Sequence, residues 1–360
     1  MSSKVYIAGI GALTAAGYNA QMVFDAVKAG LNLFQDSGYV NRHFMPVKMG
    51  LVPHDALPAI TDAIQFYGDY SRWHQQLLQL AHAPVLEALQ NYTEDAPLPI
   101  ILSCPEYYPQ WPHQLPADFI ENLSKQCGVE FCLHRRRSLH IGRAGVIEAI
   151  DIAQRMFDDT DTSYVLVGGI DSYQRPELLH GLLTEERINS EQVMDGFTPA
   201  EGACFLLLSN DPDSALGNNR YRIRLGKPGI GQEAGHLYSD DPYLGDGLAQ
   251  AVSTALASYQ GLAIDRIYSS MNGENYWSRE LGVAISRHNQ HLSDEYRVEH
   301  PADCYGDLGA ASTAMLIAIS SLALATHSSS AIHLILGSSD QSYRGALTVI
   351  TEAIAQEPAA

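Results

Sequence analysis

At residues 142–156 the chain reads GRAGVIEAIDIAQRM, and SYVLVGGIDSY follows at 163–173. The same order returns later, with GDLGAASTAMLIAIS at 306–320 and AIHLILGSSDQSY at 331–343. Each copy has a Gly-x-x-Gly start, a largely apolar segment of helical length, a short loop and an apolar strand that ends in glycine. This shared order indicates an internal duplication, in which each copy is a helix followed by a buried strand.

Two further features recur with the repeat. An aspartate lies three residues after the glycine that ends each strand, at Asp171 and at Asp340. Another apolar strand then follows, ACFLLLS at 203–209 and GALTVIT at 345–351. A helix and buried strands that alternate twice in one order predict an α/β fold in which parallel pairing dominates the core.

The repeat divides the chain near its middle. We expect an N-terminal half at residues 1–210 and a C-terminal half at 211–360. The two halves should pack as one compact unit, with the copied helices buried between sheets. Ahead of the first copy, the sequence predicts a strand at 5–10, a loop at 11–17 and an amphipathic helix at 20–29.

The composition restricts the classes of partner. The chain has 360 residues, of which 46% are hydrophobic and 18% are charged, and its formal net charge is −19. Nucleic acid and anionic membranes both require a basic face, so this balance argues against either as a partner. Residues 308–339 carry no Asp, Glu, Lys or Arg and are long enough to raise the question of a membrane span. Their many Ser, Thr and Ala residues favour a buried helix instead.

The cysteines show neither a metal-binding nor a disulfide pattern. They are odd in number and irregularly spaced, which fits neither a disulfide framework nor a zinc site. The N-terminus shows no secretory signal, so the expected location is the reducing cytoplasm. We predict no cofactor and no metal centre. The five cysteines are Cys104, Cys127, Cys132, Cys204 and Cys304.

Four stretches resemble β-ketoacyl-(acyl carrier protein) synthases, in the order of that family. Residues 5–30 are similar to its opening strand, glycine loop and helix, and VLVGGIDSY (165–173) is similar to its AGGxDS motif. The DGFVxGEGAxxLxL motif resembles MDGFTPAEGACFLLL (194–208), and GHxxGAAG resembles DCYGDLGAAS (303–312). The resemblance implies the thiolase fold, an α/β structure whose two pseudo-symmetric halves form an α-β-α-β-α layered sandwich, usually as a dimer.

The resemblance also locates the catalytic positions of that family. Its members use a cysteine at the start of a buried helix, where backbone N–H groups favour the thiolate, and two histidines that stabilise an enolate. The corresponding positions here are Gly142, Asn272 and Gly306. Because none of the three carries the required side chain, the resemblance implies a ketosynthase-like chain without the catalytic residues of the family.

Other nucleophiles near these positions leave an enzymatic alternative open. Cys304 lies two residues before Gly306, although the neighbouring aspartates would raise the pKa of its thiol. Ser138 beside His140 suggests acyl transfer, but adjacency in sequence is not the geometry of a catalytic triad. The three arginines at 135–137 indicate that this segment is an exposed loop. Cys304 is therefore the best alternative nucleophile.

Charged residues stand next to two of the glycines. Arg143 follows Gly142 and Asp307 follows Gly306, at matching places in the two copies. We expect Arg143 to form an ion pair with Asp307 or with Glu274, and to fill the space of an acyl chain or a catalytic histidine. The alternative is that Arg143 points to solvent. A buried charge is tolerated only when it is paired, so this site suits a scaffold better than an apolar acyl tunnel.

Two classes of function remain. The first is a non-catalytic scaffold, adaptor or partner subunit, similar to the chain-length factors that pair with an active ketosynthase in polyketide synthesis. NGENYWSREL (272–281) and HPADCYGDLGAA (300–311) also resemble short ketosynthase-like proteins encoded near type VI secretion genes. The implied partners are a second copy, a ketosynthase-like subunit, a component of a secretion machinery, or an acyl-carrier protein. The second class is an active β-ketoacyl synthase or acyltransferase of fatty acid or polyketide synthesis that uses another nucleophile such as Cys304.

Overall fold

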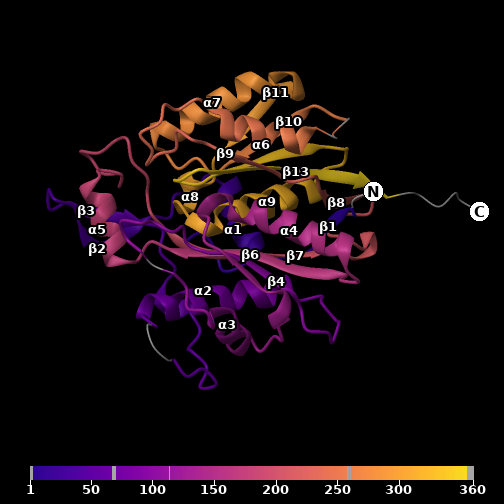
Figure 1. The fold of residues 1–360 in the computed structure, drawn as a ribbon, viewed down its shortest axis with the longest axis horizontal. Helices are drawn as coiled ribbons and strands as arrows, with labels where there is room; N and C mark the ends of the chain where they lie inside the picture. The colour runs from indigo at the N-terminus through magenta and orange to yellow at the C-terminus, as the bar shows by residue number, and fades with distance from the viewer. Residues whose placement is uncertain (1–2, 67–69, 113, 258, 260, 355–360) are drawn as a thin grey trace, which may run out of the picture.

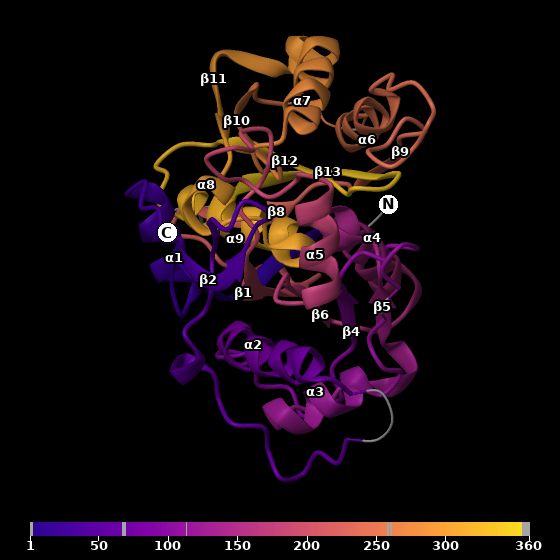
Figure 2. The same cartoon turned by 90° about the vertical axis from the view of Figure 1, so that its left-hand side faces the viewer.

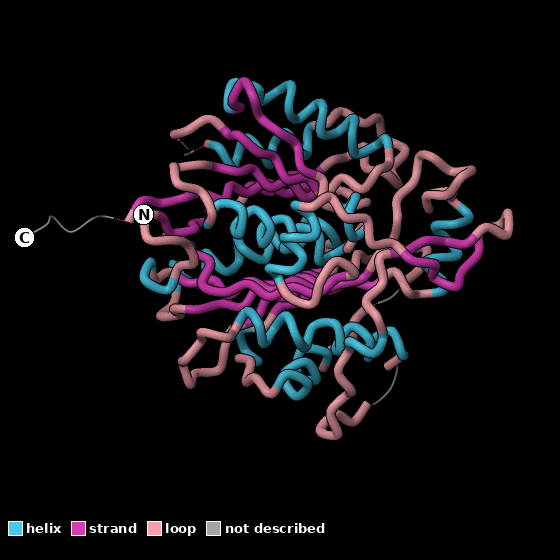
Figure 3. The backbone as a smooth tube through the Cα atoms, turned by 180° about the vertical axis from the view of Figure 1, so that it is seen from behind, coloured by secondary structure: helices cyan, strands magenta, loops and turns pink. Residues whose placement is uncertain are grey.

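Two helices, α4 (Gly145–Asp159) and α9 (Ser312–Ala325), lie at the centre of the protein between two layers of strands (Figures 1 and 3). The computed structural model describes residues 3–66, 70–112, 114–257, 259 and 261–354. One outer face is covered by α6 (Asp246–Leu256) and α7 (Asn275–His288), and the other by α2 (Arg72–Ala88) and α3 (Phe119–Cys127) (Figure 2). These five layers are the α-β-α-β-α sandwich that the resemblance predicts.

The strands of the first half follow the order β5-β4-β6-β7-β1. The central β4 pairs in parallel with β5 and β6, whereas β7 pairs antiparallel with β6 and β1. The bounds are β1 (Val5–Thr14), β4 (Ile100–Ser103), β5 (Arg137–Leu139), β6 (Tyr164–Ser172) and β7 (Glu201–Ser209).

The second half repeats this pattern with β10 in parallel with β11 and β12, and with β13 antiparallel to β12, β8 and β9. Because β8 also pairs with β1, the two strand layers join along one edge into an 11-stranded sheet within the described residues. The bounds are β8 (Tyr221–Leu225), β9 (Gly229–Gln232), β10 (Ile264–Ser269), β11 (Leu292–Glu299), β12 (Ile332–Ser338) and β13 (Tyr343–Ala353).

Shorter elements complete the described chain. A separate hairpin pairs β2 (Gln35–Val40) with β3 (Pro46–Met49), and α1 (Ala20–Lys28) packs against α9. The other helices are α5 (Pro176–Thr184) and α8 (Ala302–Tyr305). The 3₁₀ turns are η1 (His54–Ala56), η2 (Leu133–Arg135), η3 (Gly142–Ala144), η4 (Pro212–Ser214), η5 (Asn289–His291) and η6 (Gly309–Ala311).

The expectation that parallel pairing dominates the core is wrong. Parallel pairs occur where a buried helix lies in the connection, as between β4 and β6, which α4 separates, and between β10 and β12, which α9 separates. By contrast, only residues 339–342 separate β12 from β13. A connection that short reverses the chain, so these two strands must be antiparallel.

The uncharged C-terminal segment forms a buried helix, as predicted. Almost every residue of α9 from Ser312 to Ser321 is shielded, because the helix lies between both strand layers. Its buried polar side chains have hydrogen-bond partners both within the helix and outside it: the Ser321 hydroxyl donates to the Ile317 carbonyl at 2.6 Å, and the Ser320 hydroxyl lies 2.9 Å from Nδ1 of His333. Within the described residues, no helix is both long and apolar enough to cross a membrane.

Local differences from the sequence predictions are small. The first strand runs on to Thr14, so the expected loop begins later than residue 11. The arginines at 135–137 were expected in a loop, but Arg137 begins strand β5 at the edge of the sheet. The helices of the two copies follow the 3₁₀ turns η3 and η6, so that α4 starts at the second glycine of its copy, Gly145, and α9 starts after both of its glycines, at Ser312. The boundary between halves at residue 210 stays a prediction.

Candidate functional site

The starts of the two central helices meet at the middle of the protein. The 3₁₀ turn η3 leads into α4 and lies against η6, which leads into α9. The guanidinium of Arg143 is carried by η3 into the space between the two halves, where its side chain is 2% exposed. The alternative that Arg143 points to solvent is therefore wrong.

Arg143 is paired with two carboxylates. Its Nη2 lies 2.8 Å from Oδ2 of Asp307, and its Nη1 lies 2.7 Å from Oδ1 of Asp340. The Nη1 group also donates to the carbonyl oxygen of Ser338 at 3.3 Å. The expected ion pair with Asp307 is confirmed, whereas the alternative pairing with Glu274 is wrong because Glu274 has another partner.

That partner is Arg187, which connects Glu274 to Asp340. Its Nε lies 2.7 Å from Oε1 of Glu274, and its Nη1 lies 2.7 Å from Oδ2 of Asp340. Asn272 closes the group on the other side, since its amide nitrogen donates to Asp307 at 2.8 Å and to Glu274 at 3.2 Å. We call the five charged residues Arg143, Arg187, Glu274, Asp307 and Asp340 the buried ion network.

Neutral groups complete this network. The Tyr108 hydroxyl donates to Asp340 at 2.8 Å, and the Trp277 indole N–H donates to Glu274 at 3.0 Å. The Trp277 ring also lies against the Arg143 guanidinium, 5.0 Å from ring centroid to Cζ. The network has one carboxylate more than it has guanidinium groups, and these donors offset the excess negative charge.

The pKa values reflect strong pairing. Burial alone would raise the pKa of the Asp340 carboxyl, but Arg187 and Arg143 overcome that effect and hold it below its usual range. Burial would likewise lower the pKa of Arg143, but Asp307 and Asp340 raise it well above the ordinary value. Both arginine contacts therefore keep the charged form of Asp340 in the protein interior.

A buried glutamate fills the space in front of Gly142. A Cβ atom at Gly142 would lie 2.6 Å from Oε2 and 2.9 Å from Cβ of Glu106, and the φ angle of Gly142 is +76°. Glu106 is fixed in that place, because it accepts hydrogen bonds from the backbone N–H of Asp340 at 3.0 Å and of Gln341 at 2.8 Å. The glycine is thus required by both the backbone conformation and the neighbouring side chain.

Little open space remains beside the helix starts. The cavity that borders Gly142, Arg143 and Glu106 has a volume of about 10 Å³, which is the room of about one water molecule. Its other walls are Trp73, Pro105, Tyr108, Asp171, Tyr173, Arg175, Leu178 and Gly309. An acyl chain does not fit this cavity in the present conformation.

Solved structures match the chain over nearly its whole length, although no protein-family profile and no curated protein matches it. The ishigamide ketosynthase/chain length factor structure has 14% sequence identity and a TM-score of 0.74, with 98% of this chain and 100% of that chain covered. The ketosynthase ApeO in complex with its chain length factor ApeC, from Xenorhabdus doucetiae, has 17% identity and a TM-score of 0.72, with 97% and 98% covered. The ketosynthase from module 6 of the bacillaene synthase of Bacillus subtilis 168 has 11% identity and a TM-score of 0.72, with 96% and 72% covered. The chain has the ketosynthase fold.

Gly142, Asn272 and Gly306, which the resemblance places at catalytic positions, have different neighbours in this fold. Gly142 faces Glu106, and Asn272 belongs to the hydrogen bonds of the buried ion network. Gly306 directly precedes Asp307 of that network, and a Cβ there would be 2.7 Å from the Ala200 methyl group and 2.9 Å from the Thr198 carbonyl. Its φ of +89° also favours glycine.

The alternative nucleophiles of the sequence lie outside the buried ion network. Cys304 is buried in the apolar core, and burial together with Asp303 raises the pKa of its thiol to about 11. Ser138 is exposed on the edge strand β5, while Nδ1 of His140 lies 3.3 Å from the Pro105 carbonyl. Burial lowers the pKa of His140. The surroundings of Cys304 stabilise its neutral thiol over the reactive thiolate. His140 has the Pro105 carbonyl as its hydrogen-bond partner, and not Ser138.

Sequence reasoning missed several residues of the site. Arg187 and Tyr108 were not singled out, because neither lies in a recognisable motif or in the repeat. Glu106 was missed for the same reason. It lies three residues after the end of β4, close to Cys104 in the sequence. Asp340 was noted only as part of the repeat. Its equivalent in the other copy, Asp171, has a different partner, since it accepts a hydrogen bond from the Ala310 backbone N–H at 2.9 Å. Among the described residues, no group of three or more His, Cys, Asp or Glu side chains could hold a metal ion.

Raising the pH from 7 to 9 is expected to lower the free energy of unfolding by about 1 kcal/mol through Glu106. Burial and the nearby Asp340 raise the pKa of this carboxyl from 4.5 to about 8 in the folded protein. Between pH 4.5 and 8, the folded protein keeps a proton on Glu106 that the unfolded chain has released. The contribution of Glu106 to the free energy of unfolding is therefore fully present below pH 4.5 and is lost as the pH rises through 8. Burial raises the pKa of Asp171 to about 7. Asp171 therefore also lowers the free energy of unfolding as the pH rises, but its contribution is lost at a lower pH than that of Glu106.

Urea unfolding at pH 6, 7, 8 and 9 measures this dependence. The Glu106→Gln variant keeps one oxygen, which can accept one of the two backbone hydrogen bonds, because the N–H groups of Asp340 and Gln341 donate to different oxygens of Glu106. This variant cannot ionise at residue 106. It should therefore show a smaller loss of stability between pH 7 and 9 than the unmodified protein. Equal slopes for the two proteins would contradict the assignment to Glu106.

Proposed function

We propose that this chain is a non-catalytic ketosynthase-like subunit that acts as a scaffold or as the partner of another subunit. The observation that carries the proposal is the position of Glu106, whose carboxylate lies where a side chain at Gly142 would have to go. Residue 142 is the place of the nucleophilic cysteine in the resembled family. Glycine supplies no nucleophile there, and the glutamate leaves no room for one.

The buried ion network supports this reading. Arg143, Asp307 and Asp340 are each 2% exposed or less and are held by direct ion pairs. A pocket for an acyl chain needs apolar walls, whereas these side chains would lose their partners if a chain were inserted between them. The network instead connects the two halves of the fold, which suits a rigid structural subunit.

The partner is inferred from the similar structures. Two of them are described as a ketosynthase with a chain length factor. We propose that this chain pairs in the same way with a ketosynthase-like subunit, rather than acting alone. The edge strand β5 ends the described sheet, so its outer backbone groups are unpaired in the single chain and can pair with another chain. A second copy, an acyl-carrier protein and a secretion-machinery component are the other partners to be tested.

Incubation with an acyl thioester, or with the ketosynthase inhibitor cerulenin, is expected to leave the mass of the protein unchanged. Intact-protein mass spectrometry after reaction at pH 7 measures this directly. A known active ketosynthase in the same tube provides the positive control. Stoichiometric labelling that peptide mapping places on Cys304 or Ser138 would contradict the proposal and favour the enzymatic alternative.

A further inference from the structure

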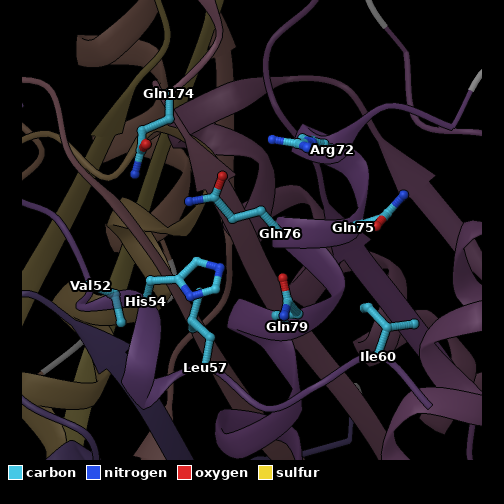
Figure 4. A pocket seen from close by; sticks show the side chains of 9 residues that line it. All are labelled: Val52, His54, Leu57, Ile60, Arg72, Gln75, Gln76, Gln79 and Gln174. Atoms are coloured by element: carbon cyan, nitrogen blue, oxygen red, sulfur yellow. The ribbon is translucent and has the colours of Figure 1, made fainter. Parts of the chain in front are cut away.

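A second hollow lies on the far side of the first strand layer from the buried ion network. It opens between helix α2 and the segment that contains η1, and has a volume of about 550 Å³ (Figure 4). None of its lining residues borders the small cavity at Gly142. The residues that line it are Val52, His54, Leu57, Ile60, Arg72, Gln75, Gln76, Gln79 and Gln174. We call this hollow the glutamine pocket.

One face of α2 gives the glutamine pocket its polar wall. Arg72, Gln75, Gln76 and Gln79 recur at helical spacing and therefore lie on the same side of the helix. The opposite side of α2 carries the leucines that pack into the core of the first half. A polar face is usual on the side of a surface helix that is turned away from the core, and here four of its polar side chains border one hollow.

Two of the amides are held in fixed orientations. The Gln76 amide nitrogen donates to Oε2 of Glu201 at 2.6 Å, and the Gln79 amide nitrogen donates to the Pro58 carbonyl at 2.7 Å. Glu201 is itself fully buried and accepts from the Ser172 hydroxyl at 2.8 Å. Because the nitrogens are bound to the protein, the two carbonyl oxygens are available as hydrogen-bond acceptors, and none of the described residues donates to them.

The remaining lining complements these acceptors. Gln75 and Arg72 form no side-chain hydrogen bond with the described residues and supply free donors. Val52, Leu57 and Ile60 provide an apolar surface on the other side of the hollow (Figure 4). The site therefore offers acceptors, donors and an apolar surface within one volume that is typical of small-molecule pockets.

The lining is mostly neutral and polar, which favours an uncharged ligand. The guanidinium of Arg72 would repel an ammonium group, and the fixed carbonyl oxygens of Gln76 and Gln79 disfavour an anion at their end of the hollow. A peptide that binds by strand addition requires a sheet edge that supplies N–H and C=O groups, and this wall is a helix. A neutral molecule with several hydroxyl groups and one apolar face meets all three requirements, because each hydroxyl both donates and accepts.

We propose that the glutamine pocket binds a neutral carbohydrate. One face of a sugar ring carries C–H groups that suit the surface of Val52, Leu57 and Ile60, while its hydroxyls reach the amides of α2. A neighbouring hollow of about 840 Å³ shares Arg72, Gln76 and Gln174 with the pocket and is lined by the aromatic rings of Tyr39 and Trp111. These rings provide surfaces for a second sugar ring, so the ligand class is an oligosaccharide.

Saturation-transfer NMR with maltotriose, cellotriose and N,N′-diacetylchitobiose tests the proposal on the full chain. We expect signal transfer to at least one of these sugars, followed by a measurable titration of that sugar in calorimetry. The Gln75→Leu and Gln79→Leu variants should each weaken that affinity at least tenfold. Gln21→Leu, on the exposed surface of α1, is the matched control and should change the affinity less than twofold.

Several outcomes would overturn the proposal. No transfer to any of the three sugars would do so, as would equal affinities of the two pocket variants and the control. Binding of the tripeptide Gly-Gln-Gly or of inorganic phosphate in place of the sugars would assign the pocket to another ligand class. Thermal unfolding of each variant checks that the fold is intact. Gln79→Leu removes the hydrogen bond to the Pro58 carbonyl and can destabilise the segment around Pro58. Gln75→Leu removes no such hydrogen bond, so the test remains valid in that case. None of these results depends on the acylation experiment.

Discussion

Replacement of Arg143 by methionine is expected to lower the free energy of unfolding by about 3 kcal/mol. The variant removes the partner that Asp307 and Asp340 share, and leaves both carboxylates in the interior with fewer donors. Breaking one side of a buried ion pair is costly because the remaining charge is neither solvated nor compensated. Urea unfolding at pH 7, followed by circular dichroism, measures the change.

The matched control is Arg42→Met on the surface. Arg42 also pairs with a glutamate, Glu186, but both side chains are about half exposed, so the expected loss is less than about 1 kcal/mol. A double variant, Arg143→Met with Asp307→Leu, should recover part of the stability, because it removes both members of a buried pair. A loss for Arg143→Met no larger than that of Arg42→Met would contradict the role assigned to the buried ion network.

Gly142→Cys is expected to lower the free energy of unfolding by about 3 kcal/mol, and not to create a reactive site. A side chain at this position must adopt a φ of +76° and would overlap with Glu106. Moving Glu106 away breaks its hydrogen bonds with the N–H groups of Asp340 and Gln341. Urea unfolding gives the stability, and mass spectrometry after exposure to an acyl thioester shows whether residue 142 has become reactive.

Gly282→Cys provides the control for glycine replacement. Gly282 lies in α7 with nothing within 4 Å of an added Cβ, so this variant should be within about 1 kcal/mol of the unmodified protein. The double variant Gly142→Cys with Glu106→Ala should lose less stability than the sum of the two single variants, because the closest overlap, with the Glu106 carboxyl group, is removed and only the contact with Cβ of residue 106 remains. Additive losses would show that Glu106 does not block this position.

The buried ion network lies where the helix starts η3 and η6 meet. Arg143 and Arg187 come from segments before β7, while Asp307, Asp340 and Glu274 come from segments after β8. The ion pairs therefore connect segments before β7 with segments after β8. Since the helix starts η3 and η6 are in contact, Arg143 on η3 and Asp307 just before η6 can pair directly.

The sequence alone was sufficient for the layered architecture. The buried helices, the apolar strands after them and the repeated glycine spacing depend on local periodicity, which the order of residues displays directly. The pair Arg143–Asp307 could also be expected, because the two residues occupy matching places in the two copies. Whether neighbouring strands pair parallel or antiparallel was harder to predict from the sequence, since it depends on the length of each connection in the folded chain.

Only the tertiary structure could decide what surrounds these residues. Glu106 and Tyr108 lie far from Arg187 and Asp340 in the sequence and share no motif with them, yet Glu106, Tyr108 and Arg187 all contact Asp340. The glutamines of α2 have a visible helical spacing, but the hollow beside them exists only because η1 and Gln174 pack across from that helix. Local spacing determines helices and strands, whereas the burial and pairing of charges depend on contacts between segments that the sequence separates.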